Sequence, residues 1–321
     1  MQASTPPKVL VITGPTATGK TALGARLAAS LGGEVVSADS MQLYKYMDIG
    51  TAKPTAEETL GIAHHMIDCV SPFESYSAAM YVKDASRCCD DILSRGKLPV
   101  IVGGTGLYIE SLLSGRDFAA RGDEAVRFRL SEEYDSLGGQ ALLQRLTGCD
   151  PEAAGRLHAN DKKRIIRALE IFETTGIPMS EHDRLSRLAP PRYFGVKIAL
   201  SFENREDLYR RIDLRVDKMM DAGLYDEVKR LLDMGLDHSC TAMQAIGYKE
   251  LADAVINGSP VADAVCRIKQ ESRRYAKRQL SWLRRDHSIK WILWKKMPDI
   301  EDALQRSTAF FQNSEYNNAV N

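Results

Sequence analysis

The pattern of apolar and polar positions along the chain predicts an α/β fold. The apolar run "KVLVITG" begins at residue 8, and "TALGARLAASLGG" follows with helix-forming residues and a glycine stop. The segments "EVVSADS" at 34–40 and "KLPVIVGGTG" at 97–106 repeat a short β-branched run that leads into a polar or glycine-rich loop. Strands and helices that alternate in this way favour a parallel sheet with helices on both faces.

The middle of the chain follows a different pattern. From about residue 118, the segments "GDEAVRFRLSEEYDSLGGQALLQRL" and "NDKKRIIRALEIFETTG" are helical and polar on one face. Strand character resumes in "FGVKIAL" at 194–200, helical stretches follow, and "IKWILW" at 289–294 is again strand-like. We therefore expect a core of residues 1–117 and 193–300, a helical insertion of residues 118–192, and a C-terminal tail of residues 301–321 that is partly disordered.

Composition narrows the class of protein. Among 321 residues, 43 Lys and Arg balance 43 Asp and Glu, so overall charge predicts no acidic partner and any such partner requires local clustering. The six cysteines lack metal-ligand spacing, and the longest apolar runs are far below the roughly 20 residues of a membrane helix. The N-terminus shows no secretion signal. These features predict a cytoplasmic protein without a membrane span.

The stretch "GPTATGKT" fits the phosphate-loop pattern between a predicted strand and a predicted helix. Its backbone N–H groups and the helix N-terminus are expected to bind a phosphate group. Lys20 would neutralise the terminal phosphates, and the Thr21 hydroxyl would complete the ligand shell of Mg²⁺. The predicted loop comprises Gly14, Pro15, Thr16, Ala17, Thr18, Gly19, Lys20 and Thr21.

Two further segments place chemistry at the same sheet edge. Asp39 follows the predicted strand in "VVSADS", at the edge where open α/β sheets bind ligands. It is interpreted as a Mg²⁺ ligand through water, as a general base, or as a helix cap. In "GGTGLY" the glycines permit close backbone approach and Thr105 offers a hydroxyl. The adjacent His64 and His65 are interpreted as structural, because no third ligand lies at metal spacing.

Basic residues cluster near the C-terminus and in the insertion. Residues 267–290 contain nine Lys or Arg against Glu271 and Asp286, a local charge of +7, with Tyr275 and Trp282 between them. This pattern suits either an RNA backbone with stacking surfaces or a solvated helix face with a core-facing aromatic side. A second basic patch surrounds Arg164 and Arg167. Two basic patches around a phosphate-loop core indicate a nucleic-acid substrate.

The chain resembles the tRNA dimethylallyltransferases along nearly its whole length. The motifs that carry the resemblance occur in family order: "GPTATGKT", "SADSMQLYKYMDIGTAKP", "HHMID", "GGTGLY", "NDKKRIIRALE", "AIGYKE" and "RRYAKRQLSWLR". The resemblance implies that the phosphate loop holds the diphosphate of dimethylallyl diphosphate, and that the isopentenyl-type chain moves to the exocyclic N6 of the adenosine 3′ of the anticodon, at position 37. It implies a phosphate-loop NTPase-like α/β fold, with Mg²⁺ as cofactor.

The resemblance also assigns roles to residues. Asp39 accepts a proton from N6 or hydrogen-bonds it, Thr105 lies beside that amine and the transferred carbon, and Lys20, Thr21, Mg²⁺ and an arginine stabilise the leaving diphosphate. Arg215 is the expected arginine, with Arg211 as the alternative. The implied tRNA contacts are Asp39, Ser40, Met41, Gln42, Thr105, Arg127, Lys163, Arg164, Ile165, Ile166, Arg167, Gln244, Ala245, Ile246, Gly247, Tyr248 and Lys249.

Three activities are compatible with these motifs. The first is prenyl transfer by a monomer to a tRNA anticodon stem-loop, whose target adenosine must be flipped out of the stack. The second is prenyl transfer to free AMP, ADP or ATP, which needs no anticodon-gripping surface and therefore no Arg164 or Arg167. The third is a non-catalytic phosphate-loop switch that binds RNA, which would not need Asp39 and Thr105 together at the sheet edge.

Overall fold

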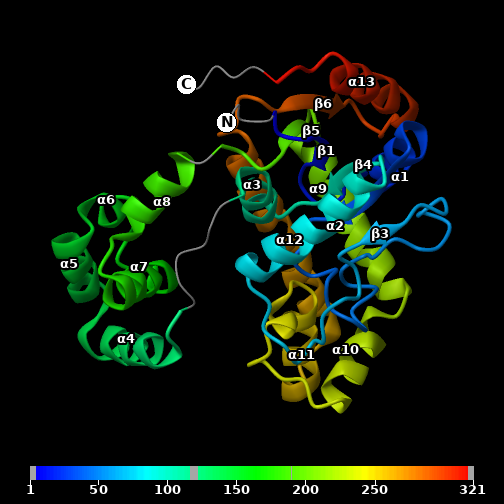
Figure 1. The fold of residues 1–321 in the computed structure, drawn as a ribbon. Coiled ribbons are helices and arrows are strands. Elements are labelled where there is room, and N and C mark those ends of the chain that lie inside the picture. Colours follow the sequence, from blue (N-terminus) through cyan, green and yellow to red (C-terminus); the bar gives the residue numbers. More distant parts are fainter. Residues whose placement is uncertain (1–4, 116–121, 189, 317–321) are drawn as a thin grey trace. The chain divides into compact units, whose positions relative to one another are not determined.

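A parallel sheet of six strands forms the centre of the core (Figure 1), in a computed structural model that describes residues 5–115, 122–188 and 190–316. The strand order is β3-β2-β4-β1-β5-β6, and every pairing is parallel. The strands are β1 (Lys8–Thr13), β2 (Gly33–Ser37), β3 (His64–His65), β4 (Leu98–Val102), β5 (Phe194–Phe202) and β6 (Lys290–Trp294). The parallel sheet confirms the predicted fold class.

Alternating side chains of the strands build two cores, one on each face of the sheet. Leu10 and Ile12 of β1 pack with α1, α9 and α13, whereas Val9 and Val11 pack with α2, α3, α10 and α11. Both faces are apolar, as expected for a parallel sheet covered by helices. The helices of the core are α1 (Lys20–Leu31), α2 (Ala78–Ser94), α3 (Gly106–Ser114), α9 (Arg205–Asp221), α10 (Leu224–Asp233), α11 (Tyr248–Asn257), α12 (Val261–Leu283) and α13 (Ile300–Gln312).

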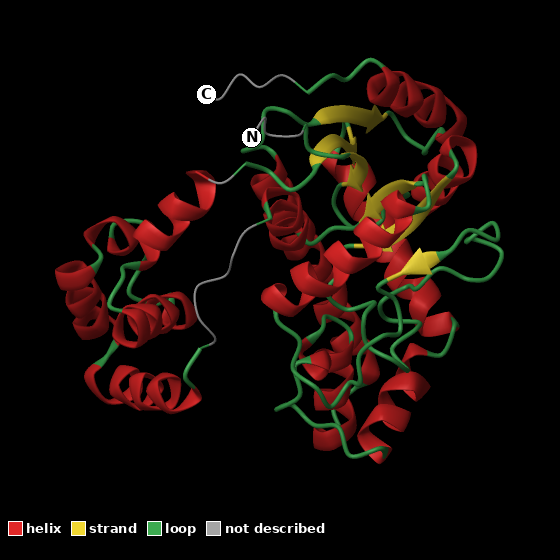
Figure 2. Cartoon of the chain, viewed as in Figure 1, coloured by secondary structure: helices red, strands yellow, loops and turns green. Residues whose placement is uncertain are grey.

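The chain divides into two compact units, residues 1–113 with 192–321 and residues 114–191. The described part of the second unit contains helices and loops without a strand (Figure 2). Its helices are α4 (Glu124–Leu137), α5 (Gly139–Cys149), α6 (Pro151–Ala154), α7 (Lys162–Thr175) and α8 (Met179–Leu188). Leu130, Leu142, Leu146 and Leu169 form much of its separate hydrophobic core.

The C-terminal segment differs from the sequence prediction. Residues 301–312, expected to belong to a partly disordered tail, form α13 together with Ile300, and the N-cap Asp299 accepts the N–H of Asp302. Ala303 of this helix is fully buried in the same core as α1. The Lys8 ammonium donates to the carbonyls of Phe311 and Ser314 at the helix end. Tertiary packing of the apolar face therefore stabilises a segment that composition alone marks as a tail; residues 317–321 lie outside the described part.

Candidate active site

The phosphate loop connects β1 to α1 by a turn that depends on unusual backbone angles. Gly14, Ala17 and Gly19 have φ values of 137°, 66° and 89°. A Cβ on Gly14 would lie 2.3 Å from the carbonyl oxygen of Leu200, so this position requires glycine. The Thr18 hydroxyl donates to the Pro15 carbonyl at 2.8 Å and closes the loop from within. The glycine-rich loop thus ends at the N-terminus of α1, an arrangement that is typical of an anion-binding site.

Lys20 is the first residue of α1, and its ammonium lies inside the loop. Its Nζ donates to the Pro15 carbonyl at 2.8 Å. Burial and, to a smaller extent, the positive charge of Arg215 lower the Lys20 pKa to about 7, against the opposing effect of Asp39. An anion beside Lys20 would favour its charged form, because the group otherwise carries an uncompensated buried charge.

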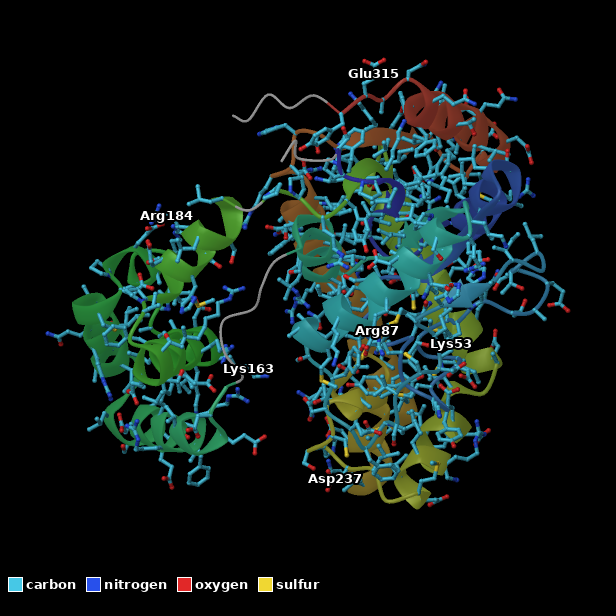
Figure 3. The ribbon with its side chains drawn as sticks, viewed as in Figure 1. Lys53, Arg87, Lys163, Arg184, Asp237 and Glu315 are labelled. Carbon is cyan, nitrogen blue, oxygen red and sulfur yellow. The ribbon has the colours of Figure 1, made fainter. Side chains whose placement is uncertain are left out.

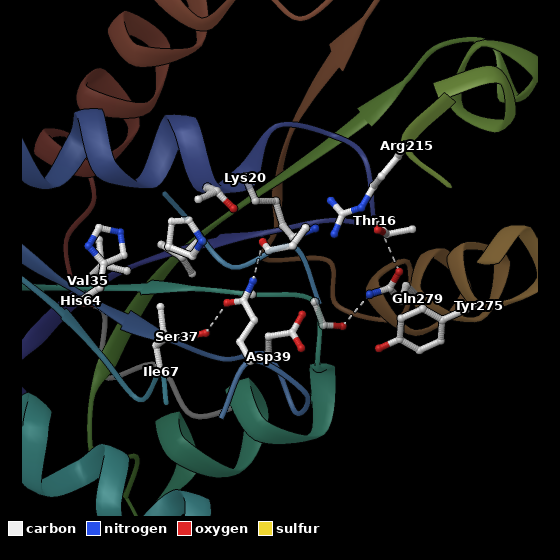
Figure 4. A pocket seen from close by; sticks show the side chains of 17 residues that line it. Thr16, Lys20, Val35, Ser37, Asp39, His64, Ile67, Arg215, Tyr275 and Gln279 are labelled. Atoms are coloured by element: carbon white, nitrogen blue, oxygen red, sulfur yellow. Dashed lines mark hydrogen bonds between the residues drawn. The ribbon is translucent and has the colours of Figure 1, made fainter. Parts of the chain in front are cut away.

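A small cavity lies against the phosphate loop (Figure 4). Its volume is about 80 Å³. Lys20, Asp39 and Arg215 point into this space from α1, the loop after β2 and α9. The remaining lining residues are Thr16, Thr21, Val35, Ser37, Gln42, Ala52, Pro54, His64, Ile67, Val102, Gly103, Gly104, Tyr275 and Gln279. We name this the donor cavity.

A larger cavity of about 330 Å³ opens beside the first. We name it the acceptor cavity. Its lining combines residues of α9, α10 and α12 with four segments outside these helices: Thr16, Asp39, Ser40, Met41, Gly50, Thr51, Ile212, Arg215, Val216, Met219, Leu224, Gln244, Ala245, Ile246, Gly247, Ile268, Ser272, Tyr275 and Arg278. A mixed apolar and polar cavity of this kind suits an uncharged planar ligand held by a few polar groups.

Four residues line both cavities and mark their junction: Thr16, Asp39, Arg215 and Tyr275. Burial lowers the pKa of Arg215, and the nearby Asp39 and Glu58 carboxylates counteract this shift. Burial raises the pKa of Tyr275 to about 12, with Asp39 acting in the same direction. The junction therefore brings together a carboxylate, a guanidinium and a neutral phenol.

Asp39 occupies a turn, not a helix start. Its Oδ1 accepts the backbone N–H of Met41 at 2.9 Å, and the residues that follow form turns before the isolated bridge at Tyr44. The helix-cap interpretation is therefore wrong. Among the described residues, Oδ2 of Asp39 has no hydrogen-bond partner, so this oxygen remains available to a ligand at the junction.

Thr105 holds the segment that carries Asp39 through two hydrogen bonds. Its hydroxyl accepts the Ser40 N–H at 3.1 Å, and its backbone N–H donates to the Ala38 carbonyl at 3.1 Å. A hydrogen bond with Thr105 also lowers the Tyr275 pKa against the larger effect of burial. Thr105 itself does not line either cavity, whereas Ser40 and Tyr275, which it contacts, do.

Two α12 residues complete the site: Tyr275, which the sequence marked only as an aromatic among basic residues, and Gln279, which the motifs did not single out. Gln279 accepts the Thr16 N–H at 3.0 Å and donates to the Gly104 carbonyl at 2.9 Å, so it joins the phosphate loop to the "GGTG" loop. Tyr275 precedes it by one helical turn and lines both cavities. The i, i+4 spacing within "YAKRQ" places both on one helix face, and this was the available signal.

The two candidate arginines of α9 have different partners. Arg211 donates from Nε to the Ala17 carbonyl at 3.2 Å and stacks over Phe202. Arg215 lines both cavities, whereas Arg211 lines neither. Arg211 thus contacts the outside of the phosphate loop, and Arg215 presents its charge to the space in which a ligand would lie.

The two histidines of "HHMID" have separate roles in the structure. His65 Nε2 lies 2.8 Å from the buried Glu34 carboxylate, which supports the structural interpretation. His64 lines the donor cavity, and its Nδ1 lies 2.9 Å from the Ile62 carbonyl. Its Nε2 is buried without a partner among the described residues. His64 therefore combines a structural contact with a position in the site.

The predicted tRNA contacts of the insertion fall into exposed and buried groups. Lys163 and Arg164 are exposed on α7, and Figure 3 labels Lys163. Ile165 and Ile166 are buried in the hydrophobic core of the insertion. This burial corrects the expectation for these two isoleucines, whose side chains are unavailable to RNA.

A buried carboxylate holds two of the arginines in the insertion. Glu170, with 0% exposure, accepts Arg127 Nη2 at 2.9 Å and Arg167 Nη1 at 3.0 Å. The arginines come from α4 and α7, so the ion pairs link these two helices. Their net charge with Glu170 is +1, which reduces the basic patch that sequence alone predicts.

The segment 244–249 is also divided by burial. Gln244, Ala245, Ile246 and Gly247 line the acceptor cavity, and Lys249 is exposed. Tyr248 is fully buried and donates its hydroxyl to Glu227 at 2.6 Å. The prediction that Tyr248 contacts RNA directly is therefore wrong, because its ring is buried in the core.

Helix α12 carries both paired and unpaired cations. Arg273 and Lys269 pair with Asp213 and Asp217 of α9, and Arg274 pairs with Glu271. Six cations within residues 267–290 make no ion pair with another described residue: Arg267, Lys277, Arg278, Arg284, Arg285 and Lys290. Arg278 lies over Tyr275 and Arg285 over Trp282. Lys277, Arg278, Arg284 and Arg285 lie in the C-terminal half of α12 or directly after it, and Arg278 lines the acceptor cavity.

No cluster of three or more His, Cys, Asp or Glu side chains has the geometry of a metal site within residues 5–115, 122–188 and 190–316. Across the same residues, no helix has both the length and the apolar character needed to cross a membrane.

The fold and the site define a phosphate-loop α/β protein of the transferase kind, in which an anion site and a second cavity meet at a carboxylate. The chain belongs to the IPP transferase family, which it matches over residues 42–286. Residues 7–71 also match an isopentenyl transferase family. The IPP transferase match includes the insertion, α9 and α12, whereas the phosphate loop and Asp39 lie within the isopentenyl transferase match.

Similar proteins agree with this assignment over nearly the whole chain. The tRNA dimethylallyltransferase of Carboxydothermus hydrogenoformans is 48% identical over 286 residues, 89% of this chain and 91% of that protein. That of Oceanobacillus iheyensis is 46% identical over 295 residues, 92% of this chain and 93% of that protein. The crystal structure of the tRNA isopentenylpyrophosphate transferase of Bacillus halodurans is 41% identical, with a TM-score of 0.70, covering 95% and 97% of the chains.

A eukaryotic relative extends the likeness to a structure with RNA. A eukaryotic dimethylallyltransferase, solved in crystallographic snapshots of its action on tRNA, is 29% identical with a TM-score of 0.82. The match covers 98% of this chain and 81% of that one. The resemblance inferred from sequence motifs is therefore confirmed.

Proposed function

We propose that this protein transfers a dimethylallyl group from dimethylallyl diphosphate to N6 of the adenosine at position 37, immediately 3′ of the anticodon in tRNA. The single observation that carries the proposal is the junction of the donor and acceptor cavities at Asp39, Arg215, Thr16 and Tyr275. A diphosphate on the phosphate loop would present its allylic carbon to this junction, and an adenine would reach it from the acceptor cavity.

The reaction is a substitution at carbon. The N6–C bond forms while the C–O bond to the diphosphate breaks, and the diphosphate leaves with the bonding electron pair. Asp39 Oδ2 takes the proton that N6 loses, because Oδ1 is already engaged by the Met41 N–H. Lys20 and Arg215 stabilise the negative charge that develops on the leaving group.

Thr105 and Tyr275 would position the reacting groups. Thr105 holds the Ser40 N–H and so fixes the turn that carries Asp39. Tyr275 stays neutral because its pKa is raised to about 12, and it lines the acceptor cavity as a flat apolar surface with a hydroxyl at its edge. A flipped adenine would stack on such a surface.

The donor set is compatible with Mg²⁺ only if the substrate supplies most of the ligands. Thr21 and Asp39 are the hydroxyl and carboxylate groups that line the donor cavity together with Thr16 and Ser37. Mg²⁺ usually keeps several waters and binds through one or two protein groups plus substrate phosphates, which fits this set. Thr21 would hold the ion, and the ion would neutralise charge on the leaving diphosphate.

Two exposed regions are proposed to contact the tRNA. Within the insertion, Lys163, Arg164, Arg167 and Arg127 supply cations, and within the core, Gln244 to Gly247 and Lys249 border the acceptor cavity. We expect the activity in the cytoplasm, where a tRNA substrate is available. We further propose that the protein acts as a monomer, with the phosphate loop, Asp39 and Arg215 of one chain at the same site.

The proposal is tested with purified protein, Mg²⁺, dimethylallyl diphosphate and an anticodon stem-loop. One dimethylallyl group per RNA is expected when adenosine follows the anticodon, and none when guanosine replaces it. AMP, ADP and ATP serve as competing acceptors. Transfer to these free nucleotides alone would establish the adenylate-prenylating alternative, and no transfer to any acceptor would leave the phosphate-loop switch. Mass spectrometry of tRNA nucleosides from cells lacking the protein gives the corresponding test in vivo.

A further inference from the structure

Glu227 of α10 is a buried carboxylate that the proposed chemistry does not use. Its side chain belongs to a residue that is 2% exposed, yet it has no basic partner among the described residues. Its Oε2 accepts the backbone N–H groups of Asp48 at 3.0 Å and Ile49 at 2.9 Å. Its Oε1 accepts the Gly50 N–H at 3.2 Å and the Tyr248 hydroxyl at 2.6 Å. Four donors therefore converge on one carboxylate.

These donors belong to two walls of the acceptor cavity. The three N–H groups belong to residues 48–50, and Gly50 and the next residue, Thr51, line the cavity. Tyr248 directly follows Gly247, which lines the cavity from another segment. Leu224, at the start of the helix that carries Glu227, lines the cavity as well. The carboxylate thus joins three separate lining segments through hydrogen bonds.

Packing makes the arrangement specific. A Cβ on Gly50 would lie 2.5 Å from the Tyr248 ring, so the loop and the ring are already in close contact. The Tyr248 pKa is raised by burial first and by the Glu227 carboxylate next, which keeps the phenol protonated as a donor. Because interiors are close-packed, a shift of the ring moves the loop, and a shift of the loop moves the ring.

The same loop is held from its other side. The Lys53 ammonium donates to the Tyr44 carbonyl and to Asp48, both at 2.7 Å, and Figure 3 labels this lysine. The Gln42 amide donates to the carbonyls of Thr51 and Ala52 at 3.3 and 3.1 Å. Glu227 accepts the loop N–H groups, Gln42 donates to two loop carbonyls, and Lys53 donates to the Asp48 carboxylate, so the loop is fixed by complementary contacts.

We propose that Glu227 is a positioning residue for the acceptor nucleoside: its carboxylate fixes the Gly50–Thr51 and Gly247 walls, and these walls place the base against Asp39. The inference rests on the proposed function, because it concerns the acceptor of that reaction. Glu227 does not contact either cavity itself and acts only through the segments it holds. A shift of about 1 Å in the position of a reacting group can lower the rate up to about 100-fold, so a residue that fixes the cavity walls can strongly affect the rate.

Glu227→Gln is the sharpest test because it keeps size and changes only the donor–acceptor pattern. Its amide oxygen can replace one carboxylate oxygen, but its NH₂ group then faces backbone N–H groups that also donate. We expect the single-turnover rate constant at saturating stem-loop RNA to fall about tenfold or more. The dissociation constants of the RNA and of dimethylallyl diphosphate should change less than about threefold, since phosphate contacts dominate the former and the phosphate loop the latter.

Glu34→Gln is the matched control. Glu34 is a buried carboxylate at the start of the sheet that binds Arg95, Lys97 and His65 and does not line either cavity. Its amide variant should lower the thermal unfolding midpoint without lowering the rate constant. Equal losses of rate in Glu34→Gln and Glu227→Gln, measured well below both unfolding midpoints, would overturn the proposal, as would a wild-type rate constant in Glu227→Gln.

Tyr248→Phe gives a second variant that removes one donor and keeps the other three. It should show a smaller loss of rate in the same direction, and it carries the test if Glu227→Gln does not fold. A wild-type rate constant in Tyr248→Phe would then overturn the proposal. Failure of the proposed function is distinguishable, because in that case the wild-type protein itself transfers nothing to RNA.

Discussion

The side chain of Gln279 on α12 accepts the backbone N–H of Thr16 in the phosphate loop at 3.0 Å. Its amide nitrogen donates to the Gly104 carbonyl at 2.9 Å. One glutamine therefore links the proposed diphosphate site to the helix that carries the unpaired cations beside the acceptor cavity. The phosphate loop is therefore hydrogen-bonded to α12, which also lines the acceptor cavity, and a substitution of Gln279 can test the importance of this contact.

Replacing Gln279 by Glu should weaken donor binding. One carboxylate oxygen still accepts the Thr16 N–H, but the other faces the Gly104 carbonyl without a proton between them. A buried polar mismatch costs about 1–3 kcal/mol, so KM for dimethylallyl diphosphate should rise about tenfold at saturating RNA. Arg274→Gln, at a solvent-side ion pair on the same helix, is the control and should leave this KM unchanged. An unaltered donor KM in Gln279→Glu would show that the Thr16 contact does not shape the loop.

Asp39→Asn isolates the charge of the proposed base from its turn. The asparagine oxygen can still accept the Met41 N–H, so the local backbone should persist. Loss of a general base typically costs 10²–10⁴-fold, and we expect the single-turnover rate constant to fall by about 10²-fold or more. RNA affinity, measured separately by filter binding, should hardly change. Unchanged single-turnover rates would reduce Asp39 to a residue that organises the turn.

The lowered Lys20 pKa predicts a pH-dependent donor affinity. In the free protein burial and Arg215 hold this pKa at about 7 instead of 10.5, so the amine is largely neutral at pH 8.5. A bound diphosphate favours the ammonium, and binding must therefore take up a proton above pH 7. Affinity for dimethylallyl diphosphate should fall as pH rises from 7 to 9. Calorimetry in EDTA, with buffers of different ionisation enthalpy, measures the proton uptake.

Lys20→Met provides the reference for this titration. The variant should bind the donor more weakly, and its affinity should not decline above pH 7, because it has no ammonium to lose. If wild type and Lys20→Met took up the same number of protons on binding dimethylallyl diphosphate, the assignment of the titration to Lys20 would be contradicted.

The same pKa shift affects the stability of the free protein. Between about pH 7 and 10.5 the unfolded chain binds more protons at Lys20 than the folded chain, so the free energy of unfolding of the wild-type protein should increase as pH rises through this window.

The ion pairs of α12 predict which cations bind RNA. Arg278 has no ion-pair partner among the described residues and lines the acceptor cavity, whereas Arg273 pairs with Asp213. Arg278→Gln should weaken stem-loop binding and reduce the slope of log K against log salt by about 1. Arg273→Gln removes the same formal charge and should change the slope less. Equal slopes for both variants would assign the salt dependence to net charge and not to contacts.

The phosphate loop and the strand-end position of Asp39 were predictable from local sequence. "GPTATGKT" encodes its own turn through glycines and a helix start, and the apolar run before Asp39 identifies a strand end in a parallel sheet. Such features depend on residues within about ten positions of each other. For the same reason the helical character of the insertion followed from periodicity alone, and the fold class from the alternation of strands and helices.

The tertiary structure decided what periodicity does not encode. Thr16 and Gln279 are 263 residues apart, and Glu227 meets Gly50 across 177, so these contacts arise only when the folded chain closes its cavities. Packing also turned the expected tail into α13 and buried Ile165 and Tyr248, which the family motif alone counted among the RNA contacts. The sequence by itself determined which chemical groups the protein has. The fold determined which of them face a ligand, because burial and long-range hydrogen bonds depend on the whole chain.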